Sequence, residues 1–156
     1  MISSTPRDGS TRVPFEQDTA IIRKGEEKSG KASACGRTLA NGSIDIPSSI
    51  SEQIAQFGSL PAITPGQDFP MTLHQVNQDG AGPYKCEIDT TGTGDNFQPL
   101  TVTTNVPGAG GNSGARAQDF PLAVAIPEGI TLTGGPTGNV GLIRKDPYGG
   151  VINRRL

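Results

Sequence analysis

Two runs of alternating apolar and polar residues, separated by a glycine-rich turn, constrain the fold of this chain more than any other feature. In the first run, Phe69, Met71 and Leu73 alternate with polar residues or proline, the period-two pattern of a strand with one buried face. The second run, residues 84–89, alternates in the same way. Residues 78–83 between them contain glycines and a proline, which favour a turn. The sequence therefore predicts an antiparallel hairpin of two neighbouring strands.

Glycine and proline are frequent along the whole chain, which has 22 glycines and 13 prolines among 156 residues. Frequent glycine and proline residues favour many short strands over long helices. Strand-like patterns follow the hairpin at residues 99–104, 120–126 and 130–133, and residues 140–143 are the candidate for a last strand. The sequence therefore predicts a mainly β fold: a single antiparallel β-sandwich-like domain with one short helix and long loops.

The one predicted helix covers residues 48–57. Ser49 and Glu52 have the spacing of a capping box, and Gly58 is a suitable helix stop. Apolar residues recur on one face of this segment, so we expect the helix to pack against the sheet.

The ends of the chain bear on its domain organisation. Residues 1–30 are rich in turn and charged sequences, so we expect a loosely structured N-terminal arm, followed by a β-sandwich-like domain over residues 31–156. The first residues contain no apolar stretch of the kind found in a signal peptide. No run is long and apolar enough to cross a membrane, so membrane insertion is not expected.

Charge and aromatic content exclude two classes of partner. The net charge of −2 gives no support for nonspecific binding to nucleic acid or to an anionic membrane. The chain has no tryptophan, which excludes a carbohydrate-binding surface built on stacked indole rings.

Cys35 and Cys86 are the only two cysteines. A disulfide between them would close a loop of about fifty residues and would stabilise the fold by roughly 4 kcal/mol in the chain-entropy model. Two buried free thiols are the alternative. A zinc site is excluded, because neither cysteine has a partner at metal-binding spacing and there is no second histidine.

His74 is the only histidine, the residue type that titrates near neutral pH. A serine triad is not indicated, since the chain has no Gly-x-Ser-x-Gly sequence. The simplest interpretation is a hydrogen-bonded strand histidine. Asp89 and Asp95 flank a glycine turn, where a glycosidase pair or a calcium site is conceivable, but capping of the turn is the simpler expectation. Asn41 lies in an Asn-Gly-Ser sequence, which accepts N-linked glycan in exported proteins.

Several sequence blocks resemble a fungal secreted family. Its members are associated with appressoria and host penetration, and they are described as cell-surface proteins or virulence factors. The blocks that carry the resemblance are residues 72–77, residues 79–84 followed by Cys86, residues 5–9, residues 101–108 and residues 119–122. The resemblance extends over nearly the whole chain. Cys35 and Cys86 fall on cysteines of that family, but the resemblance leaves their pairing open.

The resemblance implies an extracellular or cell-surface protein linked to virulence, with no cofactor and no established enzymatic activity. We expect it to bind cell-wall polysaccharide or a host surface protein through the polar edge of the predicted hairpin. The residues expected to make this contact are His74, Gln75, Asn77 and Tyr84.

An alternative follows from the histidines of the family. Its members start their mature chain with His-Gly and carry one internal histidine, an arrangement similar to that of copper-dependent polysaccharide monooxygenases. On this interpretation the chain is such an enzyme, or a decayed relative, with His74 as the internal copper ligand. The sequence given begins with Met1, so it does not contain the amino-terminal ligand.

Overall fold

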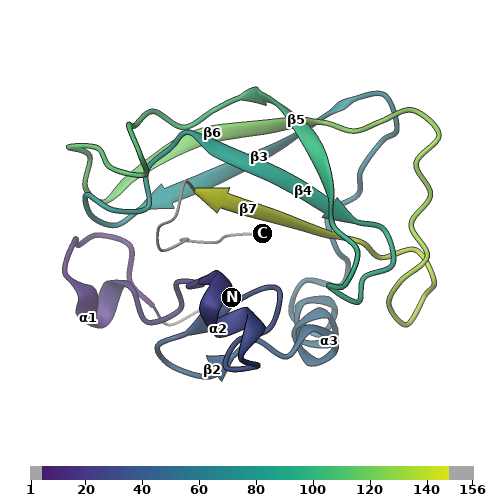
Figure 1. The fold of residues 1–156 in the computed structure, drawn as a ribbon, viewed down its shortest axis with the longest axis horizontal. Coiled ribbons are helices and arrows are strands. Elements are labelled where there is room, and N and C mark those ends of the chain that lie inside the picture. Colours follow the sequence, from purple (N-terminus) through teal and green to yellow (C-terminus); the bar gives the residue numbers. More distant parts are fainter. Residues whose placement is uncertain (1–4, 148–156) are drawn as a thin grey trace.

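The computed structural model describes residues 5–147, and its main feature is one antiparallel sheet of five strands curled into a half-barrel (Figure 1). Two short strands form a second, small sheet. The mainly β fold class is confirmed. The strands of the large sheet are β3 (Asp68–Gln75), β4 (Tyr84–Asp89), β5 (Gln98–Thr104), β6 (Gln118–Ala125) and β7 (Leu142–Pro147), and those of the small sheet are β1 (Arg37–Thr38) and β2 (Gly42–Ser43).

The order of strands in the large sheet is β3-β6-β5-β4-β7. The predicted hairpin is therefore wrong: β3 and β4 both form, but they are not neighbours. All eight residues of β3 pair with the eight residues of β6, whereas β4 lies between β5 and β7. The segment between β3 and β4 does not turn back on β3, because its backbone pairs with a second loop described below.

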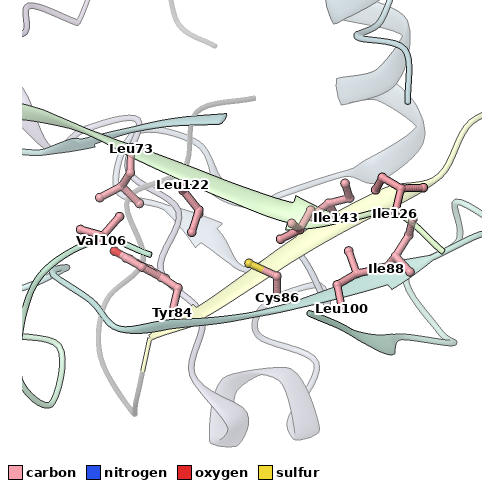
Figure 2. Packing of buried hydrophobic residues seen from close by; sticks show 10 residues of the cluster. Leu73, Tyr84, Cys86, Ile88, Leu100, Val106, Leu122, Ile126 and Ile143 are labelled. Carbon is pink, nitrogen blue, oxygen red and sulfur yellow. The ribbon is translucent and has the colours of Figure 1, made fainter. Parts of the chain in front are cut away.

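The hydrophobic core fills the inside of the half-barrel, where side chains from all five strands meet (Figure 2). Leu73 of β3 and Leu122 of β6 are fully enclosed, and Cys86 of β4 lies in the same cluster. These residues occupy the inward positions that the alternation predicts for each strand.

A layer formed by the N-terminal part of the chain lies beside the sheet (Figure 1). It contains the three helices found among the described residues: α1 (Arg12–Phe15), α2 (Lys24–Lys28) and α3 (Ile46–Phe57). A second apolar cluster joins Ile46 and Ile50 of α3 to Leu142 of β7. Arg144, also on β7, bonds Glu87 and Glu27, so an ion pair connects the layer to the sheet.

The predicted helix is present, but it begins earlier than expected. Asp45, not Ser49, is the N-cap: its carboxylate accepts the backbone N–H of Ser48 at 2.8 Å. Gly58 ends the helix in the left-handed region at φ 77°, as predicted.

The other predicted strands were partly correct. Residues 99–104 and 120–126 correspond to β5 and β6, and the last strand forms slightly later than residues 140–143, as β7. Residues 130–133 are not a strand. None of the helices in the part that the structure describes is long and apolar enough to span a membrane.

Candidate functional site: the paired-loop end

Two loops lie side by side at one end of the half-barrel, and we call residues 76–83 and 105–117 together the paired-loop end. In Figure 1 these loops are at the left of the sheet. Five backbone hydrogen bonds join them. The amides of Ala81 and Gly82 donate to the carbonyls of Gly111 and Pro107 at 2.9 and 3.0 Å, and the amides of Gly111, Ser113 and Ala117 donate to the carbonyls of Gly82, Gln78 and Val76 at 3.3, 3.0 and 3.0 Å. The loops are therefore a bonded pair and not independent turns.

The contact between the loops is close enough to require glycine. A Cβ atom on Gly82 would lie 1.8 Å from the carbonyl oxygen of Val106, and one on Gly108 would lie 2.5 Å from the carbonyl oxygen of Gly82. Both distances are far inside van der Waals contact, and the atoms met are backbone atoms. Only residues without a side chain allow this approach.

Asn105 fixes the start of the second loop to β4. Its Oδ1 accepts the backbone N–H groups of Tyr84 at 2.8 Å and Val106 at 2.9 Å, and its Nδ2 donates to the carbonyl of Tyr84 at 2.9 Å. The Tyr84 hydroxyl donates to the carbonyl of Gly80. Burial, with a contribution from nearby Cys86, raises the pKa of Tyr84 well above its usual range, so the phenol stays protonated as a donor.

Gln75 fixes the end of the second loop to β3. Its side chain is completely buried, and Nε2 lies 2.9 Å from the Ser113 hydroxyl oxygen, 2.7 Å from the Asn77 carbonyl and 3.2 Å from the Ala115 carbonyl. Its Oε1 accepts from the Ser113 hydroxyl at 3.2 Å. A neutral amide thus satisfies several groups in a place that water does not reach.

The N-terminal segment reaches the same end of the molecule. Asn77 Nδ2 donates to the carboxylate of Glu16, just after α1. Burial and the nearby charge of Asp79 raise the pKa of Glu16, and the hydrogen bond from Asn77 opposes this rise only in part. The paired-loop end is therefore held from two sides, by strands and by the N-terminal segment.

His74 makes a cross-strand pair with Asp119, which lies directly opposite on β6. Nδ1 of His74 is 2.6 Å from Oδ1 of Asp119. Because a carboxylate can only accept a hydrogen bond, the proton is assigned to Nδ1. Only 8% of the His74 side chain is exposed, against 58% for Asp119. The other ring nitrogen, Nε2, is buried and has no hydrogen-bond partner within residues 5–147.

A histidine with one nitrogen bound to a carboxylate and the other free resembles the metal-binding histidines of known sites. A copper centre needs further ligands, however. Among the residues that the structure describes, no three His, Cys, Asp or Glu side chains are grouped so that they could hold a metal ion. His74 thus offers a single ligand, and the described residues do not fit the copper site of the alternative interpretation.

The four residues expected to contact a partner are mostly inaccessible. Tyr84 is 2% exposed and Gln75 is 0% exposed, and His74 is nearly enclosed. Asn77 is half-buried and bonded to Glu16. The structure corrects the expectation: these residues support the loops from inside and do not form the polar edge of a hairpin. Alternation alone signals this for Gln75 and Tyr84, which share the inward faces of Leu73 and Cys86.

Asn105, which holds the second loop to β4, is the site residue that the sequence analysis did not single out. Its signal lies in its position directly after β5, because a lone amide at a strand end commonly bonds the neighbouring backbone. The pattern does not reveal that the backbone it bonds belongs to Tyr84, which is 21 residues earlier.

The structure has no disulfide between Cys35 and Cys86, so the bond considered between them is not formed. Cys86 belongs to the core of the half-barrel, whereas Cys35 belongs to the cluster under α3. The two thiols therefore belong to separate apolar clusters, because β4 presents Cys86 inward and Cys35 packs with Ile46 and Ile50 of α3.

Asp89 lies at the opposite end of the half-barrel and has a structural role. Its carboxylate accepts the backbone N–H of Thr91 at 2.8 Å, the Thr91 hydroxyl at 2.6 Å and the backbone N–H of Gly94 at 2.6 Å. Burial alone would raise the pKa of Asp89, but these hydrogen bonds outweigh it and lower the pKa below the usual value. Asp95 is exposed. The carboxylate therefore caps the turn, as the simpler expectation had it.

Comparison with known proteins gives the family. A sequence model of the Egh16-like virulence factor family matches residues 1–146. This chain belongs to the Egh16-like virulence factor family. It is 41% identical to the appressoria-specific virulence factor GAS1 of Pyricularia oryzae, over the whole chain and 64% of that relative's length. It is 31% identical to the appressoria-specific virulence factor GAS2 of the same fungus, over 97% of the chain and 75% of the relative. No solved structure matches it significantly.

Four of the five blocks that resemble the family meet at the paired-loop end. Residues 79–84 and 101–108 contact each other through Gly82, Asn105 and their backbone partners. Residues 72–77 and 119–122 form the adjoining strand pair of β3 and β6. Much of this signature is thus explained by the close packing of two loops and the strands that carry them.

Proposed function

We propose that this chain is a non-enzymatic binding protein of the fungal–host interface that acts during host penetration. The proposal is supported by the relatives, which are named as appressoria-specific virulence factors. It also places the protein outside the fungal cell, at the cell surface or free, where a host molecule is within reach.

The contact surface that we propose is the exposed side of the paired-loop end. The exposed polar residues of these loops are Gln78, Asp79, Asn105, Asn112 and Arg116, and the exposed Asp119 follows them on β6. The observation that carries this choice is the set of hydrogen bonds made by the buried Gln75 amide and by the Asn105 amide, which hold the two loops in one arrangement. Loops fixed on a rigid scaffold lose little entropy on binding, and such loops commonly carry binding function.

A host surface protein fits this surface better than a polysaccharide does. The exposed residues are of mixed charge, and none of them is aromatic. Sugar rings are commonly bound by stacking on aromatic faces, whereas charged and amide side chains suit the polar surface of a protein. No cofactor is part of the proposal.

Rescue of virulence tests the proposal most directly. The chain, and a variant with Asp79→Ala, Asn112→Ala and Arg116→Ala, would be expressed in a Pyricularia oryzae strain that lacks GAS1. We expect the unchanged chain to restore penetration of leaf epidermis and the triple variant to restore it much less, with the same thermal midpoint. The matched control is Ser51→Ala, Glu52→Ala and Gln56→Ala on the exposed side of α3, which should rescue fully.

Rescue by the loop variant equal to that of the control would refute the contact surface. The ligand class is tested separately, by depletion of labelled protein from solution by plant cell-wall preparations. We expect protease treatment of the preparation to abolish this depletion. Undiminished depletion after protease treatment, together with binding to purified polysaccharide, would overturn the choice of a protein partner.

A further inference from the structure

The turn between β1 and β2 carries the only Asn-x-Ser/Thr sequence in the chain, Asn41-Gly42-Ser43. We infer that Asn41 is a site of N-linked glycosylation. The inference rests on the export that the proposed function requires, because this modification is made only on chains that enter the secretory path.

The local structure leaves Asn41 open to modification. Thr38 pairs with Gly42, so Asn41 is the last residue of a three-residue connection, and it is exposed together with Gly42 and Ser43. The backbone N–H of Asn41 is held by the Thr38 hydroxyl at 3.0 Å, but its side-chain amide bonds no other residue of the described chain. A glycan attached to this amide would therefore break no hydrogen bond of the folded chain.

The neighbouring positions agree with this reading. Gly42 has φ +69°, and a Cβ built on it would meet nothing within 4 Å, so the space around the turn is empty. Ser43 is engaged in the folded protein, because its hydroxyl oxygen accepts the backbone N–H of Ser33 at 3.0 Å. The oxygen of the acceptor-sequence hydroxyl has no such contact before this region folds, which suits a modification made during synthesis.

The reaction is a transfer of an oligosaccharide from a polyprenyl pyrophosphate carrier. The amide nitrogen of Asn41 forms a bond to the anomeric carbon of the sugar. The bond between that carbon and the phosphate oxygen breaks, the carrier pyrophosphate leaves with the bonding electron pair, and the amide gives up one proton. No oxidant or reductant is needed.

The position of the turn bears on the proposed contact surface. Figure 1 shows β2 in the N-terminal layer, on the lower side of the view, whereas the paired-loop end is at the left of the sheet. A glycan at Asn41 would extend from the N-terminal layer and leave the exposed loops accessible. Loss of the glycan is therefore expected to leave virulence rescue unchanged.

The experiment uses the full chain, exported from a fungal host behind that host's own secretion leader, so that it does not depend on the native leader. Intact mass and peptide mapping are measured before and after peptide N-glycosidase, which converts a glycosylated Asn41 to Asp. We expect one glycan on the unchanged chain and on Ser43→Thr, and none on Asn41→Gln or Ser43→Ala. Asn96→Gln, an exposed asparagine outside any acceptor sequence, is the matched control and should keep the glycan.

An exported chain with Asn41 wholly unmodified would overturn the inference, and so would a glycan that persists in Asn41→Gln. Neither result would affect the proposed function, which is tested by rescue. Conversely, a glycosylated chain that fails to rescue would refute the proposed function and leave the modification site standing.

Discussion

At both ends of the half-barrel, side chains hydrogen-bond the backbone of the loops, but the two ends use different chemical groups. At the paired-loop end, the neutral amides of Gln75 and Asn105 satisfy the loop backbone. At the other end, which we call the Asp89 end (residues 89–97 and 133–140), one buried carboxylate collects the donors of its turn. Amides do not titrate, whereas a carboxylate does. The comparison teaches that protonation of Asp89 in acid should loosen the Asp89 end, whereas the hydrogen bonds of the Gln75 and Asn105 amides should persist.

The largest effect is expected where the two loops touch. Gly82→Ala places a Cβ 1.8 Å from the carbonyl oxygen of Val106, so the backbones must separate. We expect a loss of about 3 kcal/mol in the free energy of unfolding, measured by urea denaturation. Gly114→Ala is the matched control at the same end, since a Cβ there meets nothing within 4 Å, and it should change the stability by less than about 1 kcal/mol. Equal effects of both substitutions would contradict the close contact of the loops.

Asp89→Asn should have the next largest effect at neutral pH. The amide keeps one acceptor oxygen but turns its NH₂ group toward N–H donors, and we expect a loss of about 2 kcal/mol. The folded-state pKa of Asp89 lies below its usual value of 3.8, so its contribution is present above that pH and is lost as pH falls through the folded-state pKa. Stability curves of the two proteins should converge in acid. A constant difference from neutral pH to acid would show that the charge of Asp89 has no part in it.

Gln75→Glu should reverse that pH dependence at the paired-loop end. The new carboxylate would be fully buried and would face the carbonyls of Asn77 and Ala115, which raises its pKa. With a raised folded-state pKa, stability is greatest at low pH and is lost as pH rises, by about 2 kcal/mol. Gln75→Met, which removes the hydrogen bonds without adding a charge, is the control and should be destabilised equally at every pH. A Glu variant that behaves like the Met variant would argue against the role given to the buried Gln75 amide.

The smallest effect is expected at the edge of the paired-loop end. Asp119→Asn replaces a carboxylate that is 58% exposed, and its Oδ1 can still accept the proton of His74 Nδ1. A pair with an exposed carboxylate contributes little to stability, so the free energy of unfolding should fall by less than about 1 kcal/mol. His74→Ala, which empties a buried position, should cost more than Asp119→Asn. The reverse order would mean that the exposed carboxylate, and not packing, holds this strand pair.

The sequence predicts the strands well because their alternation is local. Leu73, Cys86 and Leu122 are inward in the structure as their patterns indicate. Gly58 likewise stops α3 as its residue type requires. In each of these cases the information lies within a few residues of the element concerned.

The strand order and the roles of the candidate site residues could not be read in the same way. Pairing of β3 with β6 joins His74 to Asp119 across 45 residues of sequence, and no local pattern specifies such a partner. The glycines of residues 78–83 favour a turn in any fold, but here Gly82 is needed for contact with a distant loop. The residue type of Gln75 suggests a surface group, whereas its alternation with Leu73 places it on the inward face, and in the structure it is buried.

Backbone nuclear Overhauser effects test the central claim, that the loops at one end of the half-barrel are paired and that β3 and β4 lie apart. We expect contacts between the backbone protons of residues 81–82 and 107–111, and between β3 and β6 around Leu73 and Phe120. Interstrand backbone contacts between β3 and β4, with none between the two loops, would contradict the account.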